Sequence, residues 1–437
     1  MIAEILTIGD EGLRGEIVDS NKAYLAEQLL TLDIECHYQV SVRDNPADME
    51  DAFRRATERS DVVLVSGGLG PTRDDLTTKV LAATFGRPLV LDEDSLEVIR
   101  AFFRRVGREM SENNAKQAYF PKDADVLANP EGTAPGFMIE VERTAIFCLP
   151  GVPRELRRMM EEQVLTRLAK RSMRRGAGVS RSRLLRTFGI GESSLDRELE
   201  DLAADSDLEL GFRTAFPDNY LRPVARGATA EEAEARLEEL VGALRKRLGP
   251  LIYGEGDERM PMVVGRLLRE RGLRLAVAES CTGGAIAEQV TSVPGSSEFF
   301  SGGVVAYSNS SKSALLGVSS ETIETVGAVS EPVVRAMAEG VRERFGADLG
   351  LATTGISGPG GGSEEKPVGL VHVGLSAPEG VHCDQFIFAL DRARHRVLTA
   401  QVGLDWVRRS LQGFELVGPS LMRRGGASAP GSGGSPS

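Results

Sequence analysis

The chain has 437 residues, of which 41% are hydrophobic and 27% charged, as is typical of globular domains that each bury a core. Its formal net charge of -12 argues against a general role in binding nucleic acid, because an acidic surface repels a polyanion. The sequence has no secretory signal and no apolar run of the roughly 18 residues that a membrane helix needs. The cysteines are far apart and lack metal-ligand spacing, which fits free thiols: Cys36, Cys148, Cys281 and Cys383. We therefore expect a cytoplasmic protein without membrane partners.

Residues 1–166 alternate between strand and helix patterns. The strand AEILTIG ends at Gly9, and Asn21 is expected to cap the helix that follows. The segment DVVLVSGG is apolar on both faces, as in a buried parallel strand. Such repeated β-α-β units predict an α/β fold with a doubly wound sheet, whose ligands bind at the carboxyl ends of the strands.

Polar and glycine residues follow two of these strands. A glycine loop, with backbone free to approach phosphate, predicts a nucleotide-binding site at Gly67, Gly68 and Gly70. Carboxylates near it are candidate ligands for a hard divalent cation: Asp10, Glu11, Asp74 and Asp75. An alternative for Asp74 and Asp75 is that they are acids at a helix N-terminus, where negative charge is favoured in any case.

Residues 167–255 predict a small α+β connecting domain, residues 260–412 a second α/β domain, and residues 418–437 a disordered Gly/Ser/Pro-rich tail. The connecting domain opens with a basic stretch between Arg167 and Arg186. A nucleic-acid contact is one interpretation. A solvated helix and loop is the interpretation we favour, because charge runs usually mark solvated surface.

The segment LRLAVAES-CTGG places Ser280 where a strand ends and a helix is about to start. Its hydroxyl is then expected beside the unpaired N–H groups of a helix N-terminus, which stabilise an oxyanion. Gly283 and Gly284 let a substrate approach the backbone. The alternative is that Ser280 only caps the helix. The neighbouring thiol of Cys281 is an alternative nucleophile.

A nucleophilic serine needs a base, and none of the four histidines lies in a catalytic motif. A desolvated lysine serves instead in serine–lysine enzymes, and Lys312 is the candidate, with Tyr307 on the same segment to relay a proton or orient the serine. A further strand ends in a glycine loop, which suits an anion-binding concavity or a flexible surface loop: Thr354, Gly355, Gly358, Gly360 and Gly361.

The motifs AESCTGG, FFSGGVVAYSN and TGISGPGGGSEEKPVG resemble the C-terminal domain of the CinA family, the PncC-type nicotinamide mononucleotide amidohydrolases. The resemblance implies a serine amidase that releases ammonia from nicotinamide mononucleotide without a metal cofactor. It implies Ser280 as nucleophile and Tyr307 and Lys312 as its activating partners. Thr354 and the glycines after it would shape the nucleotide site. The family's Gly-Asp-Arg reads Leu-Asp-Arg here, with Arg392 as the expected phosphate contact.

The N-terminal motifs, together with EGTAPGF and CLPGVPREL, are similar to the MoaB/MogA-like domain of the same family. This resemblance implies hydrolysis of ADP-ribose with a divalent metal (Mg, Mn or Co), and a homodimer. Gly12 and Arg14 depart from the family's leucines. Two alternatives remain open. In one, the N-terminal domain senses nucleotides without catalysis. In the other, the chain is a non-enzymatic partner in competence or DNA repair, without direct contact to nucleic acid.

Overall fold

The computed structural model describes residues 1–32, 34–174, 179–203 and 208–419. Contacts divide the chain into two units. The first unit comprises Met1–Ser182 and Ala225–Leu237, and the second comprises Arg183–Val224 and the chain from Glu238 onward. The tail expected to be disordered, 418–437, lies outside the described residues from position 420. Within the described residues, no helix is long and apolar enough to cross a membrane.

A six-stranded sheet forms the centre of the first unit, in the order β2-β1-β3-β8-β7-β6. Its strands are β1 (Ile2–Ile8), β2 (Glu35–Val42), β3 (Val62–Ser66), β6 (Asp125–Leu127), β7 (Gly136–Val141) and β8 (Thr144–Leu149). The first four strands in this order are parallel, β7 is antiparallel to β8, and β6 is antiparallel to β7. The chain changes direction at β1, between β2 and β3, and a doubly wound sheet binds ligands at such a point.

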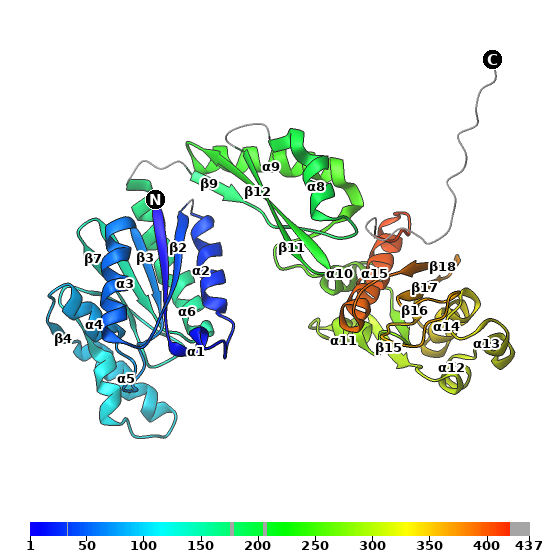
Figure 1. Ribbon diagram of the computed structural model, residues 1–437, viewed down its shortest axis with the longest axis horizontal. Coiled ribbons are helices and arrows are strands. Elements are labelled where there is room, and N and C mark those ends of the chain that lie inside the picture. The colour runs from blue at the N-terminus through cyan, green and yellow to red at the C-terminus, as the bar shows by residue number, and fades with distance from the viewer. Residues whose placement is uncertain (33, 175–178, 204–207, 420–437) are drawn as a thin grey trace, which may run out of the picture. The chain divides into compact units, whose positions relative to one another are not determined.

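Helices cover both faces of this sheet, as predicted (Figure 1). One face carries α3 (Pro46–Arg59) and α4 (Thr77–Thr84), and the other carries α2 (Ser20–Leu30), α6 (Pro153–Met159) and α7 (Leu165–Arg174). Successive residues of β3 point to opposite faces, so Val63 packs under α3 while Val62 packs under α2. This explains why β3 is apolar throughout.

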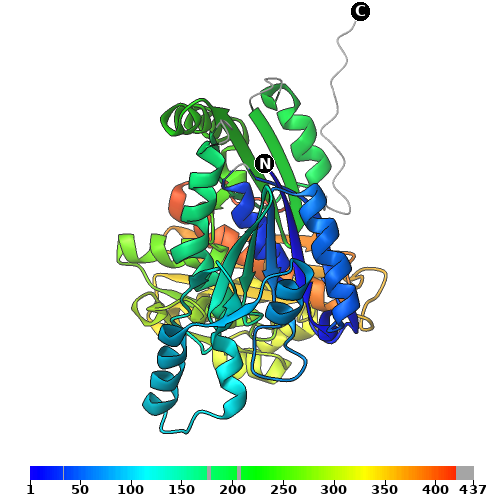
Figure 2. The ribbon, with the colours of Figure 1, turned by 90° about the vertical axis from the view of Figure 1, so that its left-hand side faces the viewer.

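The smaller elements of the first unit are α1 (Asp10–Leu13), β4 (Leu89–Leu91), α5 (Glu93–Arg105), β5 (Tyr119–Pro121) and β9 (Val179–Ser182). Figures 1 and 2 show α5 projecting from the end of the unit at which β1 ends. The expected cap of α2 is wrong. Asp19 occupies the cap position and accepts the N–H of Lys22, whereas Asn21 lies inside the helix with its side chain turned to β3.

The second unit begins with a small antiparallel sheet in the order β11-β12-β10-β13. Its strands are β10 (Leu185–Thr187), β11 (Leu208–Ala215), β12 (Asp218–Gly227) and β13 (Ile252–Glu255), with helices α8 (Glu192–Leu199) and α9 (Ala230–Leu248) in the same segment. The boundary between the two units passes through β12 and α9. This region has the predicted α+β composition.

The rest of the second unit contains a five-stranded sheet in the order β15-β14-β16-β17-β18. Its strands are β14 (Leu275–Glu279), β15 (Phe300–Val305), β16 (Leu349–Gly355), β17 (Leu370–Ala377) and β18 (Gly380–Ile387). The first three strands in this order are parallel, β17 is antiparallel to β16, and β18 is antiparallel to β17. The central strand β14 has a parallel neighbour on each side, so three strands end together at one edge.

Two groups of helices sandwich this second sheet (Figure 1). α10 (Met260–Arg271), α11 (Ala285–Thr291) and α15 (Arg392–Gln412) pack on one face, and α12 (Asn309–Leu316), α13 (Ser320–Val326) and α14 (Glu331–Phe345) on the other. Alternation along β14 again divides the core, with Val277 on the first face and Ala276 and Ala278 on the second. The predicted C-terminal α/β domain is confirmed.

A buried carboxylate joins the small sheet of the second unit to α15. Asp218, at the start of β12, accepts hydrogen bonds from Tyr253 and from Gln401 of α15, both at 2.7 Å. Desolvation raises the pKa of Asp218 to about 6. The small sheet is therefore connected to the C-terminal α/β domain by side-chain hydrogen bonds as well as by the chain, because Asp218 of β12 is bonded to Gln401 of α15.

The basic stretch forms ion pairs with the chain's own acids. In the part of the chain that the structure describes, the pairs are Arg167–Asp125, Arg171–Glu140, Arg181–Glu234 and Arg183–Glu238. Arg186 is 8% exposed and donates to the hydroxyl of Tyr220. These pairings support the interpretation of the stretch as ordinary charged surface, since these five arginines already have partners.

We predict that Gly340→Ala strongly destabilises the second unit. Gly340 lies in α14, where an added Cβ would overlap the carbonyl oxygen of Leu316 at the end of α12. Overpacking of this kind costs about 1–3 kcal/mol. Gly242→Ala in α9 is the control, because open space surrounds that position and alanine favours a helix by about 1 kcal/mol. Thermal unfolding of both variants would contradict the prediction if Gly340→Ala were the more stable.

Candidate active site

Ser280 and Lys312 meet at the edge where β15, β14 and β16 end. Ser280 follows β14 directly, and its N–H donates to the carbonyl of Thr353 at the end of β16. Lys312 lies in the first turns of α12, which follows β15. Its Nζ is 3.1 Å from the Ser280 Oγ. The structure thus brings together two of the three residues predicted to catalyse.

The amine of Lys312 is buried among backbone carbonyls. The side chain is 2% exposed, and Nζ also donates to the carbonyl oxygens of Ala306 at 3.0 Å and Tyr307 at 3.3 Å. No carboxylate forms an ion pair with it among the described residues. Desolvation therefore lowers the pKa of Lys312 below its ordinary value of 10.5. A lysine in this state is more readily neutral, which is the form that acts as a base.

Cys281, the alternative nucleophile, is in an unfavourable environment. Burial raises the pKa of its thiol to about 12. Thiols react as thiolates, so a thiol with this pKa is almost wholly unreactive at neutral pH. The structure therefore favours Ser280, which has a base at hydrogen-bond distance.

Tyr307 is placed differently from its partners. Its side chain is 60% exposed, and its hydroxyl accepts a hydrogen bond from Arg392 at 3.0 Å. Only the backbone carbonyl of Tyr307 contacts Lys312. The phenol has no hydrogen bond to Ser280 or Lys312 in the described chain. A relay through this hydroxyl therefore has no support in these hydrogen bonds and stays a prediction, as does the role of Arg392 as a phosphate contact.

The expected oxyanion donors at the start of the helix are wrong, because a side chain already occupies them. α11 starts only at Ala285, and the carboxylate of Glu279 accepts the N–H groups of Gly284, Ile286 and Ala287 at 2.8–3.1 Å. Glu279 is 1% exposed. Sequence reasoning missed this residue, because Glu279 lies five positions before Gly284, outside the spacing of the usual helix caps.

The turn between Ser280 and α11 is fixed from several directions. The Thr282 hydroxyl lies 2.9 Å from that of Thr353, and Arg396 donates to the Thr282 carbonyl at 2.9 Å. Gly283 has a φ of +59°, which favours glycine. The N–H of Thr282 has no acceptor among the described residues. Thr282 is fully buried, so its backbone is not open to a ligand as placed.

The second glycine loop begins at the same edge. Thr354 is buried and donates to the carbonyl of Ala328, and Gly355 ends β16. Arg392 donates to the carbonyl of Gly358, which ties the loop to the start of α15. Gly360 and Gly361 are exposed. The loop therefore borders the Ser280 site through its first residues.

The histidines lie away from the nucleophile, as expected. All four are within the described residues, and none is bonded to Ser280. His395 is fully buried between Ser357 and the carbonyl of Gly369, and burial lowers its pKa and that of His372. The His395 ring thus has structural partners, whereas the amine of Lys312 is the basic side-chain group at hydrogen-bond distance from Ser280.

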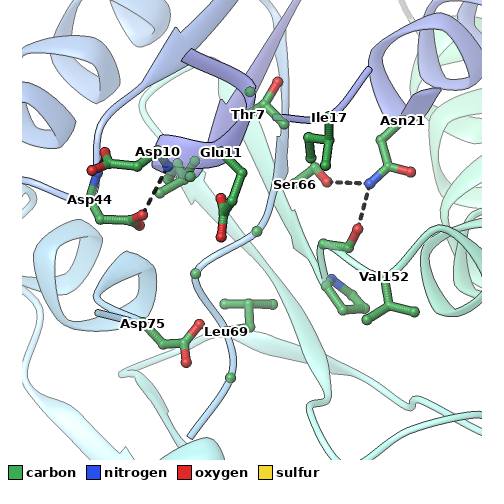
Figure 3. A pocket seen from close by; sticks show the side chains of 18 of the residues that line it. Thr7, Asp10, Glu11, Ile17, Asn21, Asp44, Ser66, Leu69, Asp75 and Val152 are labelled. Carbon is green, nitrogen blue, oxygen red and sulfur yellow. Dashed lines mark hydrogen bonds between the residues drawn. The ribbon is translucent and has the colours of Figure 1, made fainter. Parts of the chain in front are cut away.

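In the first unit, a cavity of about 1170 Å³ opens at the carboxyl ends of β1, β2 and β3 (Figure 3). The predicted glycines line it together with the predicted acids: Gly67, Gly68, Gly70, Asp10, Glu11, Asp74 and Asp75. A volume of this size accommodates a nucleotide. The sequence-derived residues of the N-terminal domain therefore share one site.

The glycine loop needs its glycines. Gly67 has a φ of +104° and Gly68 one of +68°, and added Cβ atoms would overlap the carbonyl of Ile8 and the hydroxyl of Thr77. Thr77 binds the carbonyls of both glycines from below, through its hydroxyl and its N–H. The N–H of Gly68 has no acceptor in the part of the chain that the structure describes. Such a loop suits an anionic ligand.

The four carboxylates do not form a coordination site as placed. Asp10 pairs with Arg14 at 2.5 Å, and Asp75 accepts the N–H and hydroxyl of Thr72. Asp44 lies beside them, and its pKa is raised by desolvation and by neighbouring acids (Figure 3). Across the described ranges, no three His, Cys, Asp or Glu side chains are arranged to hold a metal ion. The carboxylates as placed therefore do not support a reaction step that depends on a metal ion.

Two asparagines that the sequence did not reveal organise this cavity. Asn21 donates to Ser66 at 3.0 Å and to the carbonyl of Gly151 at 2.8 Å, joining α2, β3 and the loop after β8 (Figure 3). Asn129 does not line the cavity itself, but it donates to the carbonyl of Ala134 and to the carboxylate of Glu155, which do. Both are long-range or loop contacts of a neutral amide, for which the sequence carries no distinctive pattern.

Together these features define an α/β protein with two separate sites, one with a serine–lysine pair and one with a nucleotide-sized acidic cavity. Residues 257–411 match the family described as CinA C-terminal domain, residues 4–170 the probable molybdopterin binding domain, and residues 182–254 the damage-inducible protein CinA KH domain. The chain belongs to the CinA family.

Relatives match nearly the whole chain. A putative competence-damage inducible protein of Halothermothrix orenii is 43% identical over 413 residues, covering 94% of this chain and 99% of its own. Another of that name, from Symbiobacterium thermophilum, is 44% identical over 425 residues, covering 95% of this chain and 100% of its own. A CinA-like protein of Anaeromyxobacter is 43% identical, with 94% and 99% coverage.

Solved structures match parts of the chain. The protein CinA with unknown function from Thermoplasma acidophilum is 34% identical, covers 38% of this chain and 97% of its own, and has a TM-score of 0.35. A competence/damage inducible protein from Agrobacterium tumefaciens is 39% identical, covers 35% and 95%, and has a TM-score of 0.34.

Proposed function

We propose that the second unit is a serine amidohydrolase that converts nicotinamide mononucleotide to nicotinate mononucleotide and ammonia. The observation that carries the proposal is the 3.1 Å contact between Ser280 Oγ and the buried, carboxylate-free amine of Lys312. The choice of substrate rests on the resemblance of the surrounding motifs to the amidohydrolases of this family.

Lys312 acts on the serine directly in this mechanism. Two of its N–H groups are directed at the carbonyls of Ala306 and Tyr307, so the lone pair of the neutral amine is left to face Ser280. The amine takes the hydroxyl proton while the oxygen attacks the carboxamide carbon. The negative charge then forms on the former carbonyl oxygen.

The protonated Lys312 next supplies the proton that the leaving nitrogen needs, because an amide ion is too basic to depart alone. The C–N bond breaks, ammonia leaves, and an ester to Ser280 remains. Water then attacks this ester with Lys312 again as base, and the serine leaves with its proton restored. Arg392 contacts both Tyr307 and the glycine loop at Gly358, a position from which it is suited to bind the substrate's phosphate.

We predict that Ser280→Ala lowers ammonia release at least about 1,000-fold, since the nucleophile is removed. Lys312→Met, which keeps the length of the side chain but removes the base, is expected to have a similar effect. Cys281→Ala keeps activity within about threefold because its thiol is not ionised. Steady-state assays with nicotinamide mononucleotide test all three. Full activity of Ser280→Ala, or loss only in Cys281→Ala, would eliminate the serine mechanism.

The rate should rise with pH until Lys312 is neutral. Since desolvation lowers the pKa of this amine, the rising limb of kcat/KM is expected below the ordinary lysine value of 10.5. Ammonia release measured between pH 5 and 11 in one ionic strength checks this. A limb that follows an unshifted lysine, or the same limb in Lys312→Met, contradicts the role of this group.

A second candidate function belongs to the cavity of the first unit, for which the glycine loop with the N–H of Gly68, unpaired among the described residues, is the supporting observation. We propose that it binds ADP-ribose or a related nucleotide. The family resemblance extends this to metal-dependent hydrolysis. Asp10 is paired with Arg14, and Asp75 accepts the N–H of Thr72. The arrangement therefore supports nucleotide binding more directly than cleavage, and such binding without cleavage is the sensing alternative.

We predict that Gly67→Ala weakens ADP-ribose binding at least about tenfold, because Gly67 has a φ of +104° and the added methyl would overlap the carbonyl of Ile8. Arg55→Gln on the exposed face of α3 is the control. Calorimetry measures binding, and release of AMP with Mg²⁺, Mn²⁺ or Co²⁺ separates hydrolysis from sensing. A chelator should leave ammonia release unchanged. Equal ADP-ribose affinity in both variants would exclude this cavity as the site.

A further inference from the structure

The Tyr307 ring is an exposed aromatic surface held rigidly beside the nucleophile. Its side chain is 60% exposed, although both ends of the residue are fixed. The backbone carbonyl accepts from Lys312 at 3.3 Å, and the hydroxyl accepts from Arg392 at 3.0 Å. Arg392 is fixed in turn by the carbonyl of Gly358 at 2.9 Å. The ring is thus exposed, although the residue is held in place at its backbone and at its hydroxyl.

The attachment places the ring between the backbone that contacts Lys312 and the start of α15. Arg392 and Arg396 are four residues apart on α15 and therefore on the same face of that helix. Arg396 contacts the carbonyl of Thr282 in the turn after Ser280. The hydroxyl of Tyr307 is thus bound to the helix face that touches the nucleophile turn, while its backbone touches the base. The ring lies between these two anchor points.

We propose that Tyr307 is the residue that binds the substrate's ring, by stacking against the pyridinium of a cationic carboxamide, and that it is not a proton relay. The inference rests on the proposed amidase function. A pyridinium ring is flat and positively charged, and the electron-rich face of a phenol attracts both properties. The proposal explains why the hydroxyl is used to fix the ring instead of contacting Lys312.

The charges near the Tyr307 ring fit such a substrate. Arg392 and Arg396 have no ion-pair partner in the described residues, so they attract an anion and repel a cation. A substrate with a positive ring and a negative phosphate therefore needs a separate, uncharged surface for the ring. Tyr307 offers that surface next to Ser280, and the guanidinium of Arg392 is left for the phosphate.

Binding measured in the inactive Ser280→Ala background tests the proposal without catalysis. By calorimetry, Tyr307→Phe is expected to keep the Kd of nicotinamide mononucleotide within about twofold, because the ring remains. Tyr307→Ala should raise the Kd about tenfold or more, as the loss of a cation–π contact does. Phe414→Ala is the control, since Phe414 is also a partly exposed aromatic residue and follows the end of α15 opposite to Arg392. Thermal unfolding verifies that each variant is folded.

A second probe isolates the charge of the ring. The reduced form of nicotinamide mononucleotide has the same size but an uncharged, puckered ring. It should bind more weakly than the oxidised form, and Tyr307→Ala should change its Kd less than about threefold. Equal sensitivity of both forms to Tyr307→Ala would overturn the cation-stacking proposal.

Steady-state kinetics in protein that retains Ser280 distinguish the remaining outcomes. Stacking predicts that Tyr307→Ala changes KM more than kcat. A fall in kcat of about 100-fold in Tyr307→Phe, at unchanged Kd, would establish the relay and refute stacking. Wild-type protein that neither binds nor deamidates the nucleotide would defeat the proposed function itself. Active wild-type protein with normal binding in Tyr307→Ala would defeat only the role of Tyr307.

Discussion

The second unit depends on one interaction, the placement of a lysine amine inside the protein with only neutral acceptors around it. An ammonium in such a position loses its hydration, and the carbonyls of Ala306 and Tyr307 replace only part of it. The cost is tolerated because β15 and α12 are joined by a very short connection, which brings Lys312 back over the edge of the sheet. The same connection sets the distance to Ser280, so reactivity follows from the backbone path.

The surrounding packing keeps that path in place. α12 ends against α14, where Gly340 allows the two helices to approach until their backbones touch. On the other side of Ser280, the hydroxyls of Thr282 and Thr353 join the turn to β16. Lys312 and Ser280 are therefore carried by different elements, each fixed to a parallel strand. Their separation is determined by the sheet and not by a flexible loop.

Much of this arrangement follows from the sequence. Strand and helix periodicity predicts both large sheets, and their carboxyl edges locate Ser280, Lys312 and the glycine loop at Gly67. The burial of Lys312 does not follow, because an isolated lysine after a polar Ser-Asn-Ser segment has the pattern of exposed surface. The direction of the Tyr307 phenol depends on Arg392, which is 85 residues away in the chain. Side-chain partners at that separation leave no trace in local spacing.

The N-terminal acids illustrate the same limit at short range. Asp10 and Arg14 are four residues apart, so their pairing was accessible to sequence reasoning, and it reduces the charge available for another cation. Asp44 was not accessible, since its approach to Asp10 requires β1 and β2 to end together. Side chains with no motif of their own thus complete both sites.

The carboxylate of Glu279 separates two tasks that many hydrolases assign to the same helix terminus. Because the chain's own acid neutralises the start of α11, this terminus offers no attraction to incoming anions. Selection among ligands then falls to side chains on α15, a different element from the one that bears the reactive oxygen. Changes on α15 can alter the preferred ligand while the reaction centre stays intact, which makes this scaffold open to divergence in specificity.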